Sequence, residues 1–403
     1  MSVRLVLLIA YHFPPDNEIG AARPYRFYKY LKRLGYECHV LTASVQESGA
    51  TDIEYVADPQ RKETHWRFAW LLDRIVRKYF WNGGLRIRWS ISVFRAGRSF
   101  LKKRKDRKII ILSTAPPVAA DLAALCLAAY SGQCWIADFR DPITDTFGSH
   151  ALFQGILSRR FARLVLDRAD LALANTDLML QSWSNKYSGL DGKAHVLWNG
   201  FDPEDLVDNY ALPQRERKIL SHIGELYGGR DIQPLLQAAA QLFESGKLSR
   251  ENITIRQIGA SQRSALPGPE FLRVALAEGW LEIKKKVPAK QARLMALDSD
   301  GLFLIQPQTD IQVPAKLFEY LRVGRPILAY VMRNSPSERI LRKAGVPFEC
   351  IYPGQAPDEI ERRLLRFIVM LDGHPIRHNR WFADTFDASH QVRTLDALIR
   401  TLT

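Results

Sequence analysis

A helix start that could bind an anion lies in the second half of the chain. The stretch "QVPAKLFEYLRVG" follows the apolar run "GLFLIQP" and precedes the apolar run "ILAYV". Pro314 suits the first helical turn, because its missing N–H would have no partner there in any case. The other N–H groups of that turn, with the positive end of the helix dipole, favour an anion. Lys316 adds a positive charge, and Glu319, one turn further, could bind a sugar hydroxyl.

A second stretch of this kind helps to weigh the first. Taken alone, Lys316 and Glu319 could be an i,i+3 surface ion pair worth only about 0.2–0.5 kcal/mol. In "HIGELYGGRD", however, Gly224 and its neighbouring glycines would let the backbone approach a ligand, and Arg230 could make charge-assisted bonds to phosphate. The alternative is an ordinary loop with a solvated arginine. Two such helix starts after strands favour a phosphate site.

The first half of the chain offers a glycine and a charged strand end. Gly20, in "NEIGAARP", follows the first predicted strand, but the stretch is not a GxGxxG fingerprint, so binding of a nicotinamide dinucleotide is disfavoured. "DFRDP" places Asp138, Arg140 and Asp141 at a strand end, where charges are costly unless they meet a ligand or each other. Arg140 and Asp141 are therefore candidate catalytic residues. The alternative is a local Arg–Asp network that holds the loop.

Other chemistries find little support in the sequence. No HExxH, GxSxG or Walker A motif is present, and the "DSD" at 298–300 falls at a predicted turn. We therefore expect no metal and no other cofactor. The four cysteines form no CxxC pair, which argues against a zinc site or a disulfide framework and suits a reducing cytoplasm.

The pattern of apolar runs predicts the elements that position these residues. "RLVLLIAY", "PYRFYKYLKRLG" and "ECHVLTA" read as strand, helix and strand, the order of a parallel βαβ unit, and we take the apolar start as a strand, not a signal peptide. A polar, unperiodic stretch at 203–217 separates this series from a second α/β series. We therefore predict an α/β protein with two Rossmann-like, doubly wound domains, with ligands at the carboxyl ends of the strands in the cleft between them. The predicted parts are an N-terminal domain at 1–205, a C-terminal domain at 216–375, and C-terminal helices at 376–403 that return to the first domain.

The positive charge is concentrated in one segment. The chain has 403 residues and a net charge of +14, and residues 61–108 hold 16 Lys/Arg against three acidic residues, a net +13. Aromatic residues interleaved with basic ones suit a membrane–water interface, and each cation near an anionic leaflet contributes about 1 kcal/mol. The alternatives are a helical connection whose Trp and Leu residues pack on the domain while its charges are solvated, or nucleic-acid binding, which no motif supports. The predicted docking residues are Trp66, Trp70, Arg74, Arg77, Lys78, Trp81, Arg86, Arg88 and Trp89.

Taken together, these motifs resemble the family 4 glycosyltransferases, a retaining, group 1 type with the GT-B fold. The carriers are "YHFPPDNEIGAARPYRFYKYLKRLGYECHVLT", "STAPP", "IADFRDP", "WNGFD", "GELYGGRD" and "QVPAKLFEYLRVGRPILA". The resemblance implies that Glu319 binds the nucleotide ribose, that Arg230 and Lys316 bind the diphosphate, and that Gly20 approaches the donor from the opposite domain. The predicted donor-binding set is Gly20, Gly224, Arg230, Val313, Pro314, Ala315, Lys316, Leu317 and Glu319.

One position departs from the family pattern. The family usually has two glutamates eight positions apart, and the first would fall at Ile311. Gln308, Asp310 and Gln312 are near enough for one of them to contact the transferred sugar. The departure bears on which sugar is moved more than on whether one is moved.

The resemblance implies a metal-independent, retaining hexosyl transfer from a UDP- or GDP-sugar to an acceptor hydroxyl. A donor phosphate oxygen would take the acceptor proton. The basic segment suggests a glycan or lipid-linked acceptor in polysaccharide biosynthesis, with the protein peripheral on the cytoplasmic face of the cell membrane and no nucleic-acid partner. The alternatives are a nucleotide-sugar epimerase of the same architecture and a non-catalytic membrane-associated scaffold.

Overall fold

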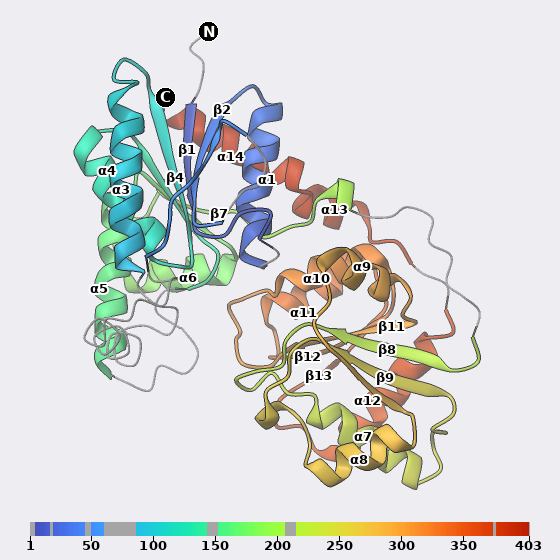
Figure 1. The fold of residues 1–403 in the computed structure, drawn as a ribbon. Coiled ribbons are helices and arrows are strands. Elements are labelled where there is room, and N and C mark those ends of the chain that lie inside the picture. The colour runs from blue at the N-terminus through green and yellow to red at the C-terminus, as the bar shows by residue number, and fades with distance from the viewer. Residues whose placement is uncertain are drawn as a thin grey trace. The chain divides into compact units, whose positions relative to one another are not determined.

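The computed structural model describes residues 5–16, 19–44, 50–59, 86–142, 152–205, 215–373 and 376–402. They belong to two compact units, the first made of Met1–Gly200 with Ala388–Thr403 and the second of Phe201–Asp387. Each unit contains one parallel sheet covered by helices (Figure 1).

In the sheet of the first unit, the direction in which successive strands are added changes between β1 and β4. The order is β3-β2-β1-β4-β5-β6-β7, and β1 pairs in parallel with both β2 and β4. The carboxyl ends of β1 and β4 therefore form a topological switch point, where ligands bind in open α/β sheets. The strands are β1 (Leu5–Ala10), β2 (Glu37–Thr42), β3 (Ile53–Tyr55), β4 (Ile109–Ala115), β5 (Trp135–Phe139), β6 (Leu171–Ala174) and β7 (Ala194–Val196).

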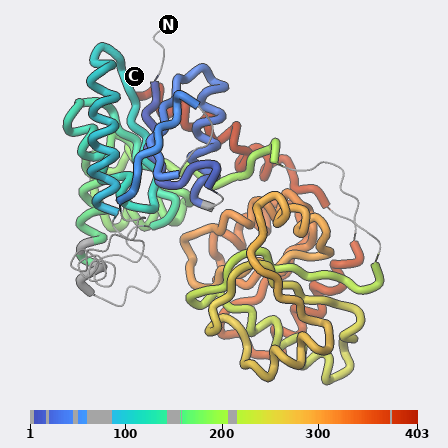
Figure 2. Tube along the Cα trace, in the orientation of Figure 1, coloured from blue at the N-terminus to red at the C-terminus, as the bar shows by residue number. Residues whose placement is uncertain are grey.

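Two separate apolar layers cover this sheet, because alternate residues of a strand point to opposite faces. Leu5, Leu7 and Ile9 pack with the layer that contains α3, α4, α5 and α6, whereas Val6 and Leu8 pack with α1 and α14. Helix α14 lies beside α1, so the red end of the chain returns to the blue first unit (Figure 2). The helices are α1 (Ile19–Arg33), α3 (Ile87–Lys102), α4 (Ala119–Ser131), α5 (Leu152–Arg168), α6 (Asp177–Lys186) and α14 (Ala388–Thr401).

The second unit repeats this arrangement. Its strand order is β10-β9-β8-β11-β12-β13, so β8 and β11 form its switch point. The strands are β8 (Lys218–Ile223), β9 (Ile253–Ile258), β10 (Leu281–Lys284), β11 (Gly301–Gln306), β12 (Ile327–Val331) and β13 (Phe348–Ile351). The helices are α7 (Gln233–Glu244), α8 (Pro269–Ala277), α9 (Ala289–Leu297), α10 (Ala315–Val323), α11 (Pro336–Ala344), α12 (Pro357–Met370) and α13 (Arg380–Phe386), with 3₁₀ turns at Pro203–Asp205 and Arg263–Ala265.

The two doubly wound parallel domains predicted from the sequence are confirmed, as is the packing of a C-terminal helix on the first domain. The chain passes between the units after Gly200 and again after Asp387, so α13 belongs to the second unit and α14 to the first. None of the described helices combines the length and apolar character that crossing a membrane requires.

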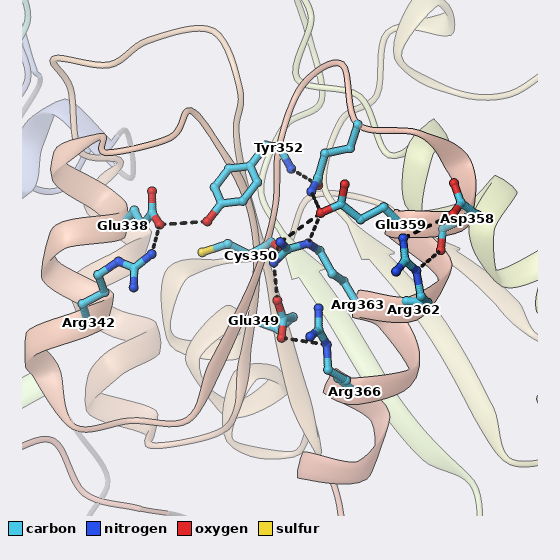
Figure 3. Close-up of polar contacts among 11 residues, drawn as sticks. Glu338, Arg342, Glu349, Cys350, Tyr352, Asp358, Glu359, Arg362, Arg363 and Arg366 are labelled. Carbon is cyan, nitrogen blue, oxygen red and sulfur yellow. Dashed lines mark hydrogen bonds and ion pairs between the residues drawn. The ribbon is translucent and has the colours of Figure 1, made fainter.

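A buried carboxylate anchors α11 in the second unit (Figure 3). Glu338 is 2% exposed and accepts hydrogen bonds from the Tyr352 hydroxyl at 2.8 Å, from the Asn334 N–H at 2.6 Å and from Arg342. The hydroxyl of Ser335, the N-cap residue of α11, accepts the N–H of Glu338. These contacts fix the start of α11 against the end of β13.

Candidate functional site

The two anion-suited stretches meet at the switch point of the second unit. The loop after β8 contains Gly224 and Arg230, and the loop after β11 leads into α10 (Figure 1). Strands β8 and β11 are hydrogen-bonded neighbours, with Leu220 opposite Gly301. Their carboxyl ends therefore lie side by side. The structure thus brings together residues separated by about a quarter of the sequence.

Helix α10 is tied to the end of β8 by its buried face. The Tyr320 hydroxyl accepts the N–H of Ile223 at 2.9 Å, and Leu317 and Phe318 are fully buried. Pro314 is the N-cap residue and provides no side-chain cap, so the first turn keeps N–H groups for another acceptor. Burial raises the pKa of Tyr320, so this hydroxyl stays protonated.

Lys316 lies against the end of β8. Its Nζ is 3.4 Å from Nε2 of His222, and a Cβ built on Gly224 would lie 2.0 Å from Nζ. Gly224 also has φ +147°, a conformation that other residues rarely adopt. The positive φ therefore favours glycine here, and an added Cβ would also displace the end of the Lys316 side chain.

The pKa values in this cluster are those expected for positive charges that lie close together without a bound anion. Burial, and then the charge of Arg230, lower the pKa of Lys316 to about 7, while Glu225 opposes the shift. Burial and the two cations also hold the pKa of His222 well below its usual range, so this imidazole is neutral. An anion at this place would raise the pKa of Lys316 again.

Arg230 stands beside this lysine with its guanidinium over the ring of Tyr227, 5.0 Å from the centroid. Among the described residues, no carboxylate forms an ion pair with Arg230, and its buried Nε has no hydrogen-bond partner. Of the two acidic residues in this loop, Glu225 pairs with Lys286 at 3.3 Å and Asp231 accepts the N–H of Gln233 at 3.2 Å. Two cations thus share one strand end.

The residues predicted to contact the sugar are placed differently from one another. The Gln308 side chain donates to the carbonyl of Gly228, so it links the two loops. Asp310 is exposed, and Gln312 and Ile311 are half-buried. Gln308 is therefore engaged in holding the glycine loop.

The remaining donor-binding predictions lie along the same helix start. Val313 and Leu317 are buried in the core, so only their backbone could meet a ligand. Ala315 and Glu319 are half-buried, and the carboxylate of Glu319 acts electrostatically on Arg322. His222 and Tyr320 were missed, although a polar residue near the end of an apolar strand is a readable signal for His222.

In the first unit, Asp138 and Arg140 of "DFRDP" have separate partners among the described residues. Asp138 is fully buried and pairs with Arg23, at 2.6 Å from Nη2, and the Thr114 hydroxyl also donates to it at 2.9 Å. Arg140 donates to the carbonyls of Gly20, at 2.5 Å, and of Ala115 and Pro116. Gly20 lies in the first turn of α1 and not in a loop, so Arg140 holds the start of this helix against the end of β4.

Arg23 was not predicted, yet it organises this edge. Besides Asp138, it donates to the carbonyls of Leu197 at 2.8 Å and Trp198 at 2.6 Å. Asp141, by contrast, is exposed.

The predicted docking residues fall into two groups. Trp66, Trp70, Arg74, Arg77, Lys78 and Trp81 lie outside the described residues. Trp89 is fully buried, and its indole N–H donates to the Val56 carbonyl at 3.0 Å, so its prediction as a docking residue is wrong. Arg86 pairs with Asp58 at 2.9 Å, and Arg88 is exposed on α3.

The "DSD" aspartates serve the fold. Asp298 pairs with Arg215 at 2.8 Å, and Asp300 accepts the N–H of Ile219 at 2.8 Å. Within the described ranges, no group of three or more His, Cys, Asp or Glu residues is arranged to hold a metal ion.

Comparisons with known proteins show the fold. No family model matches the chain, and no curated protein matches it in sequence. The structure of HepE from Anabaena in complex with UDP and glucose is 11% identical, with 99% of this chain and 100% of that chain covered and a TM-score of 0.62.

Two further structures are similar over comparable lengths. Sucrose-phosphate synthase from Thermosynechococcus elongatus is 10% identical, covers 99% of each chain and has a TM-score of 0.67. A structure named as a UDP-N-acetylglucosamine 2-epimerase, from Listeria monocytogenes, is 12% identical, covers 100% of this chain and 97% of that one, and has a TM-score of 0.58. With its two doubly wound sheets, this chain has the GT-B fold.

Proposed function

We propose that the protein transfers a glycosyl group from a nucleotide-sugar to an acceptor hydroxyl. The observation that carries the proposal is the cation cluster at the β8–β11 switch point. Lys316 is half-buried, its pKa is lowered to about 7, and Arg230 beside it lacks a carboxylate partner among the described residues. A diphosphate supplies the missing charge, and α10 offers the N–H groups of its first turn.

The chemistry that follows is stabilisation of a leaving group. Negative charge grows on the nucleoside diphosphate as the bond to the sugar breaks, and preorganised donors aimed at that charge lower the barrier. Arg230, Lys316 and the start of α10 perform this task in the proposal. Glu319, one turn along α10, binds the ribose as the resemblance implies.

Substitution of Arg230 tests the role. Arg230→Ala should lower turnover of UDP-glucose about a hundredfold, the loss typical of one charge-stabilising donor. Arg273→Ala is the matched control, because Arg273 is exposed in the same unit and pairs with Glu270. Equal turnover in the two variants would reject the assignment. Thermal-shift measurements with UDP-, GDP- and ADP-sugars identify the donor.

The finer features of the reaction rest on the family 4 resemblance. We propose metal-independent hexosyl transfer with retention of anomeric configuration. Product analysis by NMR distinguishes retention from inversion, and turnover in EDTA tests the independence from metal.

We further propose that the acceptor is a glycan or lipid-linked precursor at the cytoplasmic face of an anionic membrane. The exposed side of α3 supports this, because it combines Ile87 and Ile91 with several cations. Those cations are Arg88, Arg95, Arg98 and Lys102. Sedimentation with vesicles that contain anionic lipid should deplete the protein at low salt and release it at high salt. Failure to sediment at low salt would remove this part of the proposal.

An epimerase is the second candidate, and its likeness in fold to the Listeria structure supports it. An epimerase converts a nucleotide-sugar without any acceptor. Formation of free UDP only when an acceptor is present therefore favours transfer. A non-catalytic scaffold, suggested by Ile311 in place of the first family glutamate, need bind neither UDP nor GDP, which calorimetry decides.

A further inference from the structure

The Lys316 ammonium has one hydrogen-bond partner among the described residues. That partner is Nε2 of His222 at the end of β8, 3.4 Å from Nζ. An ammonium group carries three N–H donors, so two of them remain for a ligand. Gly224 leaves room for the contact, because a Cβ there would lie 2.0 Å from Nζ and 3.9 Å from Cε1 of His222. The lysine and the imidazole therefore meet where the diphosphate is proposed to bind.

The sheet holds the imidazole of His222 in one place. The residue is 1% exposed and lies opposite Gln257 of β9. On the side of β11, its ring packs against Phe303, with centroids 6.3 Å apart and the ring planes at 74°. A ring packed between two neighbouring strands has little freedom, whereas the stem of a lysine is flexible. His222 is thus the fixed member of the pair, and Lys316 is the adaptable one.

The contact determines which imidazole nitrogen carries the proton. A charged ammonium group only donates, so Nε2 accepts and the proton of the neutral ring lies on Nδ1. Burial and the charges of Lys316 and Arg230 hold the pKa of His222 well below its usual range, so the ring stays neutral. Nδ1 is buried and has no hydrogen-bond partner among the described residues. Such an unsatisfied group costs stability, and costs of this kind are expected where a residue serves a function.

We propose that His222 is a positioning residue for the diphosphate-binding lysine, an inference that rests on the proposed function. Its Nε2 accepts a hydrogen bond from Lys316 and holds the ammonium group at the end of β8, which leaves two N–H donors for phosphate oxygens. The imidazole touches no ligand in this role and exchanges no proton. Because the ring is neutral, it can lie beside Lys316 and Arg230, where a third positive charge would disfavour both.

Removal of the acceptor tests the role through the affinity for UDP, measured by calorimetry at pH 7. His222→Phe keeps a ring against Phe303 but has no acceptor, and His222→Leu removes the ring as well. We expect either change to weaken UDP binding about tenfold, as for the loss of one hydrogen bond to a charged group. His222→Gln, whose amide oxygen can replace Nε2 as the acceptor, should stay within about threefold of the wild-type affinity.

A double-mutant cycle separates positioning from a merely structural role. Lys316→Met has no ammonium group to hold, so adding His222→Phe to it should change the UDP affinity by less than about twofold. His39→Phe is the matched control, because His39 also lies in a strand and packs against a phenylalanine, with its ring centroid 4.3 Å from that of Phe100, but in the first unit. His39→Phe should bind UDP as tightly as the wild type does.

A spectroscopic readout tests the pair without any ligand. Nitrogen NMR of isotope-labelled histidines distinguishes a protonated ring nitrogen from a bare one, and the His222→Gln variant assigns the signals. At pH 6, where Lys316 is charged, His222 should show a protonated Nδ1 and a bare, hydrogen-bonded Nε2. Lys316→Met should shift the Nε2 resonance, because it removes the donor.

Three results would overturn the inference. They are a wild-type UDP affinity in both His222→Phe and His222→Leu, an undiminished loss from His222→Phe in the Lys316→Met background, and an Nε2 resonance that Lys316→Met leaves in place. Failure of the proposed function is recognised separately, because the wild type would then bind neither UDP nor GDP. In that case the response of the Nε2 resonance to Lys316→Met still decides whether His222 holds the lysine.

Discussion

The lowered pKa of Lys316 makes nucleotide binding depend on pH in a way that can be calculated. The free protein holds this lysine at a pKa of about 7, because its ammonium group is largely desolvated and the charge of Arg230 acts on it. Bound diphosphate favours the charged form, so the pKa rises on binding and a proton is taken up. The affinity for UDP is therefore strongest below pH 7, where the lysine is charged. It falls as the pH rises through 7 and the lysine loses its proton.

The size of the effect follows from the protonated fraction. A group with a pKa of about 7 is half protonated at pH 7 and about 1% protonated at pH 9. The affinity for UDP should therefore fall about 50-fold between these values, or about 2.3 kcal/mol. UDP itself contributes little, because the second pKa of a phosphate group is about 6. Neutral His222 does not titrate in this range, since its pKa lies well below the usual value.

Calorimetry in two buffers of different ionisation enthalpy measures both quantities. At pH 8 we expect an uptake of about 0.9 proton per bound UDP. Lys316→Arg should bind with an affinity that is flat from pH 7 to 9, since arginine stays charged, and Lys316→Met should bind weakly and equally flatly. A wild-type affinity that does not change over this range, without proton uptake, would refute the reasoning.

Three further outcomes follow from the second unit. Gly224→Ala should weaken UDP binding tenfold or more, because the added Cβ meets Nζ of Lys316 at 2.0 Å and the backbone strain costs about 1–3 kcal/mol. Gly189→Ala is the control for a strained glycine elsewhere, because a Cβ there would have nothing within 4 Å. Equal UDP affinities of the two variants would contradict the role of Gly224. Lys316→Met should raise the melting temperature while it lowers UDP affinity, since it removes a buried charge that faces another cation, and a lower melting temperature would show that the lysine stabilises the fold. Glu338→Ala should lower the free energy of unfolding by about 2 kcal/mol, because the Tyr352 hydroxyl and the Asn334 N–H lose their acceptor. Asp358→Ala, at an exposed ion pair, should change it by less than about 1 kcal/mol, and chemical denaturation compares the two.

Much of the fold could be predicted because buried parallel strands leave a strong signal. "RLVLLIAY" and "GLFLIQP" are continuous apolar runs, and each is followed by a helix with a readable start or stop. Trp89 shows the limit of this reasoning. It was grouped with the basic residues around it, yet it falls with Val93 and Phe100 on the buried side of α3. Helical spacing, weighed above composition, would have placed it in the core.

The candidate site was predicted in part for a similar reason. Lys316 and Arg230 each follow a strand, so the carboxyl-end rule alone brings them to one edge of the sheet. The partners of buried charges could not be predicted. Asp138 pairs with Arg23 across 115 positions and not with Arg140, two residues away, and a single sequence contains no signal for such a pairing. The same holds for the Tyr320 hydroxyl, which bonds to Ile223.

The return of α14 to the first unit bears on how the chain folds during synthesis. Val392, Leu395 and Ile399 complete the apolar layer beneath α1, and they emerge from the ribosome after the whole of the second unit. The first unit to be translated is thus the last to close its core. Until then, part of the β1–β4 face stays uncovered, and a fragment that ends at Gly200 would leave that surface exposed to aggregation.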